Sequence, residues 1–341
     1  MAARKRRINL ALQGGGAHGA FTWGVLDRLL EDDTIEITGI SGTSAGALNG
    51  AALKAGLVEG GRQGARDTLD WLWEQVGAVG DMRLAHWMTA LTPSPGSISK
   101  AIESSFAYGI TDAMSRVFSP YSYGPFYQNP LSRVVERFEY ASICANADPA
   151  LFVCATNVRT GKVKVFSGDE ITADAILASA CLPTVFKAVE IGEDVYWDGG
   201  YTGNPALFPL FAPELPSDIV IVNINPLERD EVPMDSHGIL NRINEISFNS
   251  SLLRELRAID FVQRLIADDK VSSDAMKKVR VHMIADDELM TELSVASKLV
   301  PTPQTLKALF EAGRRATDGF LEGDAKSIGK RSSVDLPEMF G

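Results

Sequence analysis

The pattern of apolar and polar positions at the start of the chain predicts two strands, each followed by a tight turn and a helix. Residues 8–12 form a short apolar run that ends at glycines 14–16, which predicts a buried strand. Residues 35–40 predict a second strand, which leads through a sharp turn at 41–44 into a helix of small residues at about 45–56. This alternation is typical of a parallel α/β sheet with its site at the carboxyl ends of the strands. The helix between the strands has one apolar face, made by Phe21, Val25, Leu26, Leu29 and Leu30.

Residues 60–140 differ in composition, because aromatic residues and prolines are frequent there. We expect helices and long loops that form a cap over the sheet. The segment 118–127 is a candidate wall or lid of the site, and the alternative is an ordered loop packed on the core. Aromatic residues of the region include Trp71, Trp73, Trp87, Tyr108, Phe118, Tyr121, Tyr123, Phe126 and Tyr127.

The second half of the chain predicts further strands and two long helices. Residues 151–156 and 162–166 resemble paired strands, and 219–224 is a continuous apolar run typical of a buried strand. An amphipathic helix at about 238–267 either covers the core, which we favour, or forms a homodimer surface. One more strand and one more helix are expected at 279–285 and about 302–323.

No internal repeat or interdomain linker is visible, so we expect a single α/β domain over residues 1–341. Its catalytic core spans 8–225 and includes the cap at about 60–140. Residues 226–325 form a C-terminal extension of helices and strand, and 326–341 are expected to be a loose tail.

The composition limits the partners. The net charge of -11 argues against broad nucleic-acid binding. The basic run at 4–7 is a solvated chain end or, alternatively, a weak contact with anionic lipid headgroups. Cys144, Cys154 and Cys181 are too few for a disulfide framework and fit a reducing compartment. No apolar run approaches a membrane span or a secretory signal, so we expect a cytoplasmic protein with, at most, peripheral membrane contact.

The motif Gly42-Thr43-Ser44-Ala45-Gly46 lies at the turn between the second predicted strand and the next helix. A nucleophilic serine needs such a turn, because the glycines let the chain bend sharply enough to point the serine oxygen outward. The amides at the start of the helix would then face developing negative charge. The alternative is a serine that only caps the helix. Placement between a strand and a helix of small residues favours the nucleophile.

A second glycine motif, Gly14-Gly15-Gly16-Ala17-His18-Gly19, also follows a strand and opens a helix. Its spacing matches a dinucleotide-binding fingerprint, which also requires an acidic residue at the end of the second strand. That strand ends at Ile40-Ser41-Gly42, and Glu36 lies at its beginning. We therefore favour an oxyanion hole, in which glycines let backbone N–H groups approach a tetrahedral intermediate.

Asp198-Gly199-Gly200 ends another predicted strand, and on its own this motif could be an ordinary turn. A serine nucleophile, however, needs a base, and no histidine lies in the late loop that a Ser–Asp–His order requires. A dyad of Ser44 and Asp198 therefore fits better than a triad. Burial beneath a cap would raise the pKa of Asp198 and make it a better base. The four histidines are His18, His86, His237 and His282.

These three motifs, in this order, resemble those of the patatin-like phospholipases, and the resemblance covers about residues 8–225. It implies a three-layer sandwich with a central, mostly parallel sheet between helices. It also implies hydrolysis of lipid acyl esters by a Ser–Asp dyad without a metal or other cofactor. Two further segments also resemble those that flank the aspartate turn in that family: Ala178-Ser179-Ala180 with Pro183, and Asn204-Pro205.

Carried over position by position, the resemblance implies that Ser44 is the nucleophile and Asp198 the base. Gly14, Gly15 and Gly16 would supply the oxyanion donors. The other motif glycines are Gly19, Gly42, Gly46, Gly199 and Gly200.

The glycine loop departs from the family pattern at two positions. Gln13 stands where the family usually has an acid, and His18 stands where it usually has Arg or Lys. A cation there would hold a phosphate or steady the loop, so a neutral His18 weakens the expectation of strict phospholipid preference. We expect His18 to pack the loop rather than to act as a base.

Three functions remain open from the sequence. The favoured one is an acyl-ester hydrolase with a lipid substrate. The second is a thioesterase or acyltransferase of the same chemistry, which product analysis with an added alcohol would separate. The third is a catalytically silent lipid-binding regulatory protein, against which the intact Ser44 and Asp198 argue.

Overall fold

The computed structural model describes residues 5–79, 94–103, 119–122, 129–272 and 275–340, which form a mixed sheet between helices. The strands are β1 (Arg6–Leu12), β2 (Ile35–Thr43), β3 (Ala150–Asn157), β4 (Val163–Ser167), β5 (Val189–Ile191), β6 (Asp194–Asp198), β7 (Asp218–Val222) and β8 (Arg280–Ile284). The eight-stranded sheet has the order β5-β6-β3-β2-β1-β7-β8, and β4 pairs with β3. Strands β3, β2, β1, β7 and β8 are parallel, whereas the β3–β4, β3–β6 and β5–β6 pairs are antiparallel.

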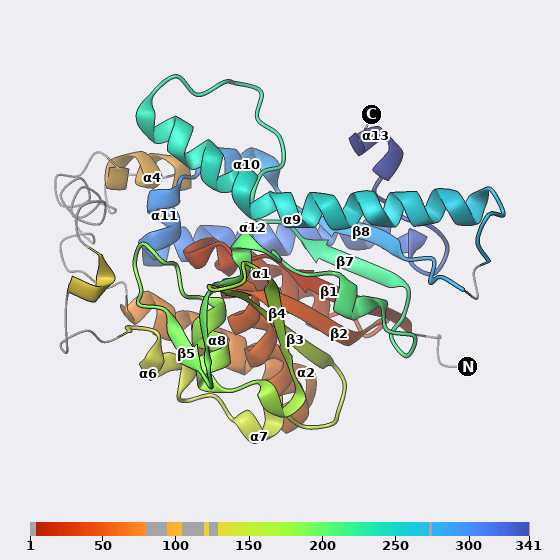
Figure 1. The fold of residues 1–341 in the computed structure, drawn as a ribbon, viewed down its shortest axis with the longest axis horizontal. Coiled ribbons are helices and arrows are strands. Elements are labelled where there is room, and N and C mark those ends of the chain that lie inside the picture. Colours follow the sequence, from red (N-terminus) through yellow and green to blue (C-terminus); the bar gives the residue numbers. More distant parts are fainter. Residues whose placement is uncertain (1–4, 80–93, 104–118, 123–128, 273–274, 341) are drawn as a thin grey trace.

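Helices cover both faces of this sheet. The longer ones are α1 (Gly19–Leu30), α2 (Ala45–Val79), α9 (Ser236–Ala267) and α12 (Pro303–Glu322). The shorter ones are α4 (Pro95–Glu103), α6 (Ser132–Val135), α7 (Tyr140–Ile143), α8 (Ala173–Ser179), α10 (Asp287–Glu292), α11 (Val295–Leu299) and α13 (Leu336–Phe340). Figure 1 shows α9 along one side of the sheet, with α2 and α8 on the other.

Alternation along the strands separates two hydrophobic cores. In β1, Leu10 and Leu12 pack with α1, α2, α8 and α12, whereas Ala11 faces α9 and α13. In β7, Val220 likewise packs in the first of these cores and Ile221 in the second. Successive side chains of a strand point to opposite faces, so a strand that is apolar throughout must be covered on both. The predicted class, a three-layer α/β sandwich with a mostly parallel sheet, is confirmed.

The first part of the region predicted to form a cap, residues 60–79, is instead a continuation of a helix. The helix predicted at 45–56 continues as α2 to Val79, across a kink at Gly60 and Gly61, where Gly61 has a φ of +62°. Beyond the kink, Leu69 and Leu72 are fully buried in the core beside α1. Residues 60–79 therefore belong to a layer of the sandwich. Of the aromatic segment 118–127, only 119–122 lie within the described residues.

Both ends of the domain pack more closely than expected. The segment expected to be a loose tail, 326–341, is packed over its described residues 326–340, since Leu336 is buried and the Ser333 N–H donates to the Val281 carbonyl of β8. At the other end, Arg7 lies in β1 and forms an ion pair with Glu36. The basic run is thus partly engaged within the fold.

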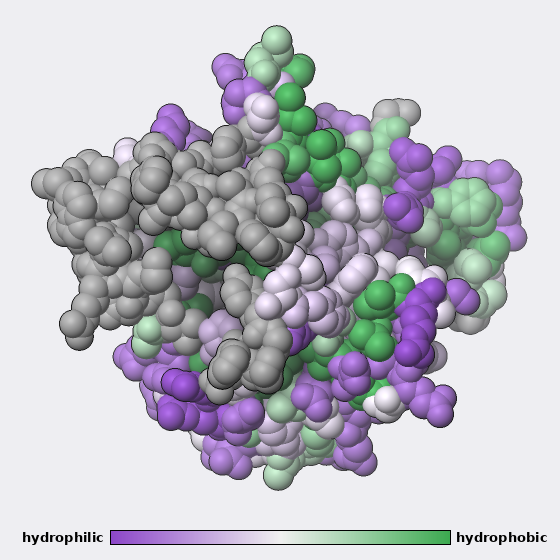
Figure 2. Space-filling view, turned by 60° about the vertical axis from the view of Figure 1, so that its left-hand side comes forward, coloured by the Kyte–Doolittle hydropathy of each residue, from purple (hydrophilic) through white to green (hydrophobic). Residues whose placement is uncertain are grey.

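Helix α9 buries one face on the sheet through Leu252, Leu256 and Ile259, as the core-covering hypothesis requires. Its first turns expose apolar side chains, and Figure 2 shows apolar surface at the top of the molecule, over this part of α9. The exposed residues there are Ile239, Leu240, Ile243 and Ile246. Among the described helices, none is long and apolar enough to cross a membrane.

Candidate active site

The predicted nucleophile lies on a strained turn. Ser44 stands between the last residue of β2 and the first of α2, with a φ of +54° that is unusual for a residue with a side chain. The turn closes tightly, because a Cβ at Gly42 would lie 2.5 Å from the Gly46 carbonyl oxygen and one at Gly46 would collide with the Leu12 carbonyl. The sequence therefore places glycine where neighbouring backbone leaves no space for a side chain.

Hydrogen bonds attach this elbow to the neighbouring elements. The Ser44 N–H donates to Ser179 Oγ (2.9 Å), and that hydroxyl donates to the Cys154 carbonyl (2.6 Å). Thr43 Oγ1 donates to the Gly203 carbonyl at 2.6 Å, in the loop after Asp198. Ser179 of the Ala178-Ser179-Ala180 segment thus holds the backbone of Ser44 from α8.

The predicted base is fully buried. Asp198 Oδ1 accepts the Gly200 N–H at 2.7 Å, whereas Oδ2 has no hydrogen-bond partner among the described residues. Burial raises the pKa of Asp198 to about 7, an effect that the Gly200 N–H and the neighbouring Ser44 hydroxyl offset in part. The carboxyl therefore lies beside the Ser44 hydroxyl with one oxygen available and a pKa near neutrality.

Gly199 and Gly200 allow this turn to pack closely. A Cβ at Gly199 would collide with the Cys154 carbonyl, and one at Gly200 would collide with the ring of Phe248 on α9. The turn is thus enclosed by β3 on one side and by α9 on the other.

The glycine loop lies directly against the elbow. A Cβ at Gly14 would be 2.7 Å from the Ser44 Cβ, so only glycine fits there. The Gly14 N–H, however, donates to Asn204 Oδ1 at 2.7 Å and is therefore engaged. No hydrogen bond from the Gly15 or Gly16 N–H to another described residue is found, and Gly16 has a φ of +57°. Of the three predicted oxyanion donors, Gly15 and Gly16 have available N–H groups.

His18 packs the loop, as expected from the sequence. Its ring is 2% exposed and Nε2 lies 2.8 Å from Ser297 Oγ on α11. Burial, followed by the nearby Lys298 ammonium, holds the pKa of His18 well below its usual value. A neutral ring bonded to Ser297 ties the loop to α11 and brings no positive charge.

The sequence contains a second set of serine, histidine and aspartate side chains, which the structure places away from Ser44. His282 Nε2 lies 3.0 Å from Asp218 Oδ1, and Nδ1 lies 3.1 Å from Ser333 Oγ. Asp218 begins β7, so this cluster lies at the amino ends of the parallel strands. Of the other histidines, His86 and the side chain of His237 lie outside the described residues.

The residues that bind the glycine loop from outside were not predicted. Gln13 Oε1 accepts from the Ile224 and Asn225 N–H groups at 2.9 and 3.1 Å, and Gln13 Nε2 donates to Asn249 Oδ1 at 3.2 Å. A carboxylate at position 13 could accept the first two bonds but could not donate the third. The amide thus explains the departure from the family's acid. The Asn225-Pro226 pair directly after the predicted strand 219–224 is a sequence signal by which Asn225 could be found.

No group of three or more His, Cys, Asp or Glu side chains in the described ranges is arranged to hold a metal ion. A tight turn that carries Ser44, a glycine loop packed against it and a buried carboxyl are the features expected of an α/β acyl hydrolase. A family model described as patatin-like phospholipase matches residues 10–211, and the chain belongs to this family. That membership indicates lipid acyl hydrolase activity.

Solved structures give a weaker likeness. VipD from Legionella pneumophila is 14% identical with a TM-score of 0.42, and the match covers 93% of this chain and 67% of that one. The heterodimeric ExoU–SpcU complex of the type III secretion system of Pseudomonas aeruginosa gives 18% identity and a TM-score of 0.31, over 95% of this chain and 61% of that one. The comparison with curated proteins finds no match.

Proposed function

We propose that this protein is a lipid acyl-ester hydrolase that works through an acyl-enzyme on Ser44, with Asp198 as its base. The N–H groups of Gly15 and Gly16 stabilise the oxyanion. Membership of the family supports the lipid substrate, and the arrangement of the three motifs supports the assignment of roles.

In the first half of the reaction, Ser44 Oγ bonds to the ester carbonyl carbon while its proton passes to the free oxygen of Asp198. The carbonyl oxygen gains the negative charge and lies against the glycine loop. The tetrahedral intermediate then collapses, the bond to the alcohol oxygen breaks, and Asp198 returns the proton to that leaving oxygen.

In the second half, water attacks the acyl-enzyme and gives its proton to Asp198. Collapse of this intermediate breaks the bond to Ser44 Oγ, which recovers the proton, and releases the fatty acid. Since both halves start with an ionised Asp198, the rate should rise as pH increases through its pKa of about 7.

The single observation that carries the proposal is the state of Asp198. A fully buried carboxyl whose Oδ2 has no hydrogen-bond partner within the described ranges costs stability, and a raised pKa brings the carboxyl closer to the range in which a base works at neutral pH. An ordinary turn would not need such a group beside a serine.

A fluorophosphonate probe tests the proposal, because the phosphorus that the serine attacks resembles the tetrahedral intermediate. The probe should label the protein once, at Ser44, and labelling should disappear in Ser44→Ala. Ser250→Ala is the matched control, since the Ser250 hydroxyl donates to the Ser247 carbonyl within its own helix, α9.

Mass spectrometry locates the adduct. A folded wild-type protein without an adduct, or with one on another residue, would favour a silent lipid-binding protein.

A further inference from the structure

The glycine loop depends on residues beyond the part of the chain that matches the family model. The match ends at residue 211. The loop is held by Asn225 after β7, and by Ser297 and Lys298 on α11. A Cβ at Gly16 would collide with the Lys298 carbonyl, so α11 lies directly on the loop. The C-terminal extension is therefore part of this site.

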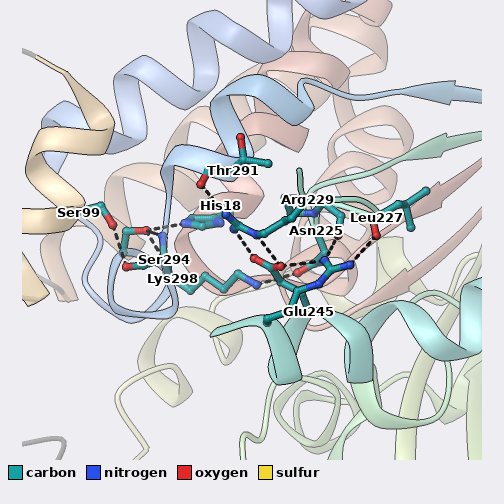
Figure 3. A network of polar contacts seen from close by, with 12 residues as sticks. His18, Ser99, Asn225, Leu227, Arg229, Glu245, Thr291, Ser294 and Lys298 are labelled. Carbon is teal, nitrogen blue, oxygen red and sulfur yellow. Dashed lines mark hydrogen bonds and ion pairs between the residues drawn. The ribbon is translucent and has the colours of Figure 1, made fainter. Parts of the chain in front are cut away.

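A continuous chain of hydrogen bonds connects Lys298 with the loop. Lys298 Nζ donates to Asn225 Oδ1 at 2.8 Å, and Asn225 Nδ2 donates to the Gly14 carbonyl at 2.9 Å. Figure 3 shows the Lys298 side chain extending from α11 toward Asn225. The Gly14 carbonyl and the Gly15 N–H belong to one peptide group. The chain thus ends at an N–H that we have proposed as an oxyanion donor.

The orientation of the Asn225 amide is fixed by its partners. Its oxygen receives the Lys298 ammonium, and its nitrogen donates both to Gly14 O and to Gln13 Oε1, at 3.1 Å. Each hydrogen bond strengthens the next one in the chain. An amide N–H becomes a stronger donor when the oxygen of the same amide group accepts a hydrogen bond. The positive charge of Lys298 therefore makes the Gly15 N–H a better donor.

The charge of Lys298 is not cancelled by its acidic neighbour. Glu245 is already bound by two arginines, with Arg229 Nε at 2.9 Å and Arg242 at 3.2 Å. The hydrogen bond from Lys298 instead goes to a neutral amide. His18, on the same loop, is neutral and bonded to Ser297.

We propose that Lys298 is a positioning residue of the oxyanion hole. It supplies, through Asn225 and the Gly14–Gly15 peptide, the positive charge that His18 does not bring to the glycine loop. This inference rests on the proposed function, because it requires negative charge to develop at the Gly15 N–H. The effect is larger in the transition state than in the ground state, so it acts on kcat more than on KM.

The proposal has a pH consequence. Burial lowers the pKa of Lys298 to about 8, with Glu245 raising it in part and Arg229 lowering it. His18 faces Lys298 from the glycine loop and stays neutral. As pH rises through this pKa, Lys298 loses its proton and the rate should fall. Asp198 controls the ascending side of the profile and Lys298 the descending side.

The test compares Lys298→Met and Lys298→Arg with the wild type, using kcat and KM for a short-chain aryl ester across this pH range. Lys307→Met is the matched control, since Lys307 is an exposed lysine of α12 whose partner is Glu311. Below the pKa of Lys298, the Met variant should lose about tenfold in kcat with little change in KM. Its profile should lack the descending side, so that it meets the wild type at high pH.

Lys298→Arg should keep kcat and extend it to higher pH, because the guanidinium stays charged. Lys307→Met should match the wild type. Parallel profiles for Lys298→Met and the wild type would indicate a purely structural role and overturn the proposal. The same holds for a Lys298→Arg profile that falls where the wild type falls, a result that does not depend on whether the Met variant folds.

Fluorophosphonate labelling separates this inference from the proposed function. If the wild type is not labelled at Ser44, the proposed function fails. If the wild type and Lys298→Met are labelled at the same rate below the pKa of Lys298, only the role of Lys298 fails.

Discussion

Asp198 and Asp218 are two buried carboxyls at opposite ends of the same sheet, and their surroundings differ sharply. Asp198 ends β6 beside the carboxyl end of β3, and its side-chain Oδ1 accepts a hydrogen bond from the Gly200 N–H. Asp218 begins β7 at the opposite end of the sheet. It accepts hydrogen bonds from three groups: Arg280, His282 and the Gly329 N–H.

The same burial has opposite outcomes at the two sites. For Asp198 it raises the pKa to about 7. Burial also tends to raise the pKa of Asp218, yet hydrogen bonds from His282 and Arg280 hold that pKa well below its usual range. An acid surrounded by donors stays ionised and binds its neighbours, whereas an acid with few donors can take up a proton near neutrality. Ser333, His282 and Asp218 therefore have the residue types of a triad without its environment.

The largest difference should appear in catalysis. Asp198→Asn should lower kcat by about 10³-fold, because the amide cannot take the proton of Ser44. Asp218→Asn should leave kcat for the same short-chain ester within about threefold of the wild type in the folded fraction, because this carboxyl lies at the other end of the sheet.

Circular dichroism of each variant shows whether it is folded. Equal loss of kcat in two folded variants would remove the distinction between base and structural acid.

For conformational stability, Asp218→Asn should be the more damaging of the two substitutions. Asp218→Asn should lower the free energy of unfolding by about 3 kcal/mol near neutral pH, because it leaves the Arg280 guanidinium without its carboxylate. The folded pKa of Asp218 is depressed, so its contribution is present above the unfolded value of about 4 and is lost as pH falls below it. Urea unfolding at neutral and acidic pH measures this. A deficit that stays constant between the two would contradict it.

The contribution of Asp198 to stability should change with pH in the opposite direction to that of Asp218. Its folded pKa is raised, so the wild type loses stability as pH increases from about 4 to about 7. Asp198→Asn does not titrate and should gain about 2 kcal/mol relative to the wild type over that interval, after allowance for local relaxation. Thermal unfolding at the two pH values checks this. A difference between variant and wild type that does not change with pH would argue against a raised pKa.

The fold was largely predictable because its elements repeat simple patterns. The apolar runs at 8–12 and 219–224 correspond to β1 and β7, and the amphipathic period at about 238–267 corresponds to α9. The end of α2 was not predictable in this way, since Gly60 and Gly61 suggest a stop where the helix only kinks. The packing of residues 326–340 depends on contacts with β8, which no local sequence pattern encodes.

The site was predictable only where local backbone geometry dictates the sequence. Gly42 and Gly46 are needed by the turn itself, so a motif reveals them. Asn225 and Lys298 act through side chains brought together across 73 residues of chain, and nothing near either one marks this role. The hydrogen bond from the Gly14 N–H to Asn204 Oδ1 could not be predicted for the same reason, because the two residues are far apart in the sequence.

The smallest effects should come from two histidines. His18 packs the glycine loop beside the Ser44 turn, and His282 binds Asp218. His18→Asn should lower kcat by less than about tenfold, because it weakens a tie between the glycine loop and Ser297 without removing a base. His282→Asn should leave kcat unchanged, because its ring bonds Asp218 and Ser333 away from Ser44, and should lower the unfolding temperature.

These two variants also decide between a dyad and a hidden triad. His18 is the described histidine nearest to the elbow in sequence and lies on the proposed oxyanion loop. If His18→Asn lost as much activity as Asp198→Asn while remaining folded, His18 would be a base. The neutral state of its buried ring would then have a catalytic meaning, because a base must be unprotonated to accept the proton of Ser44. A loss limited to a few-fold, with the ascending pH profile unchanged, leaves Asp198 as the base.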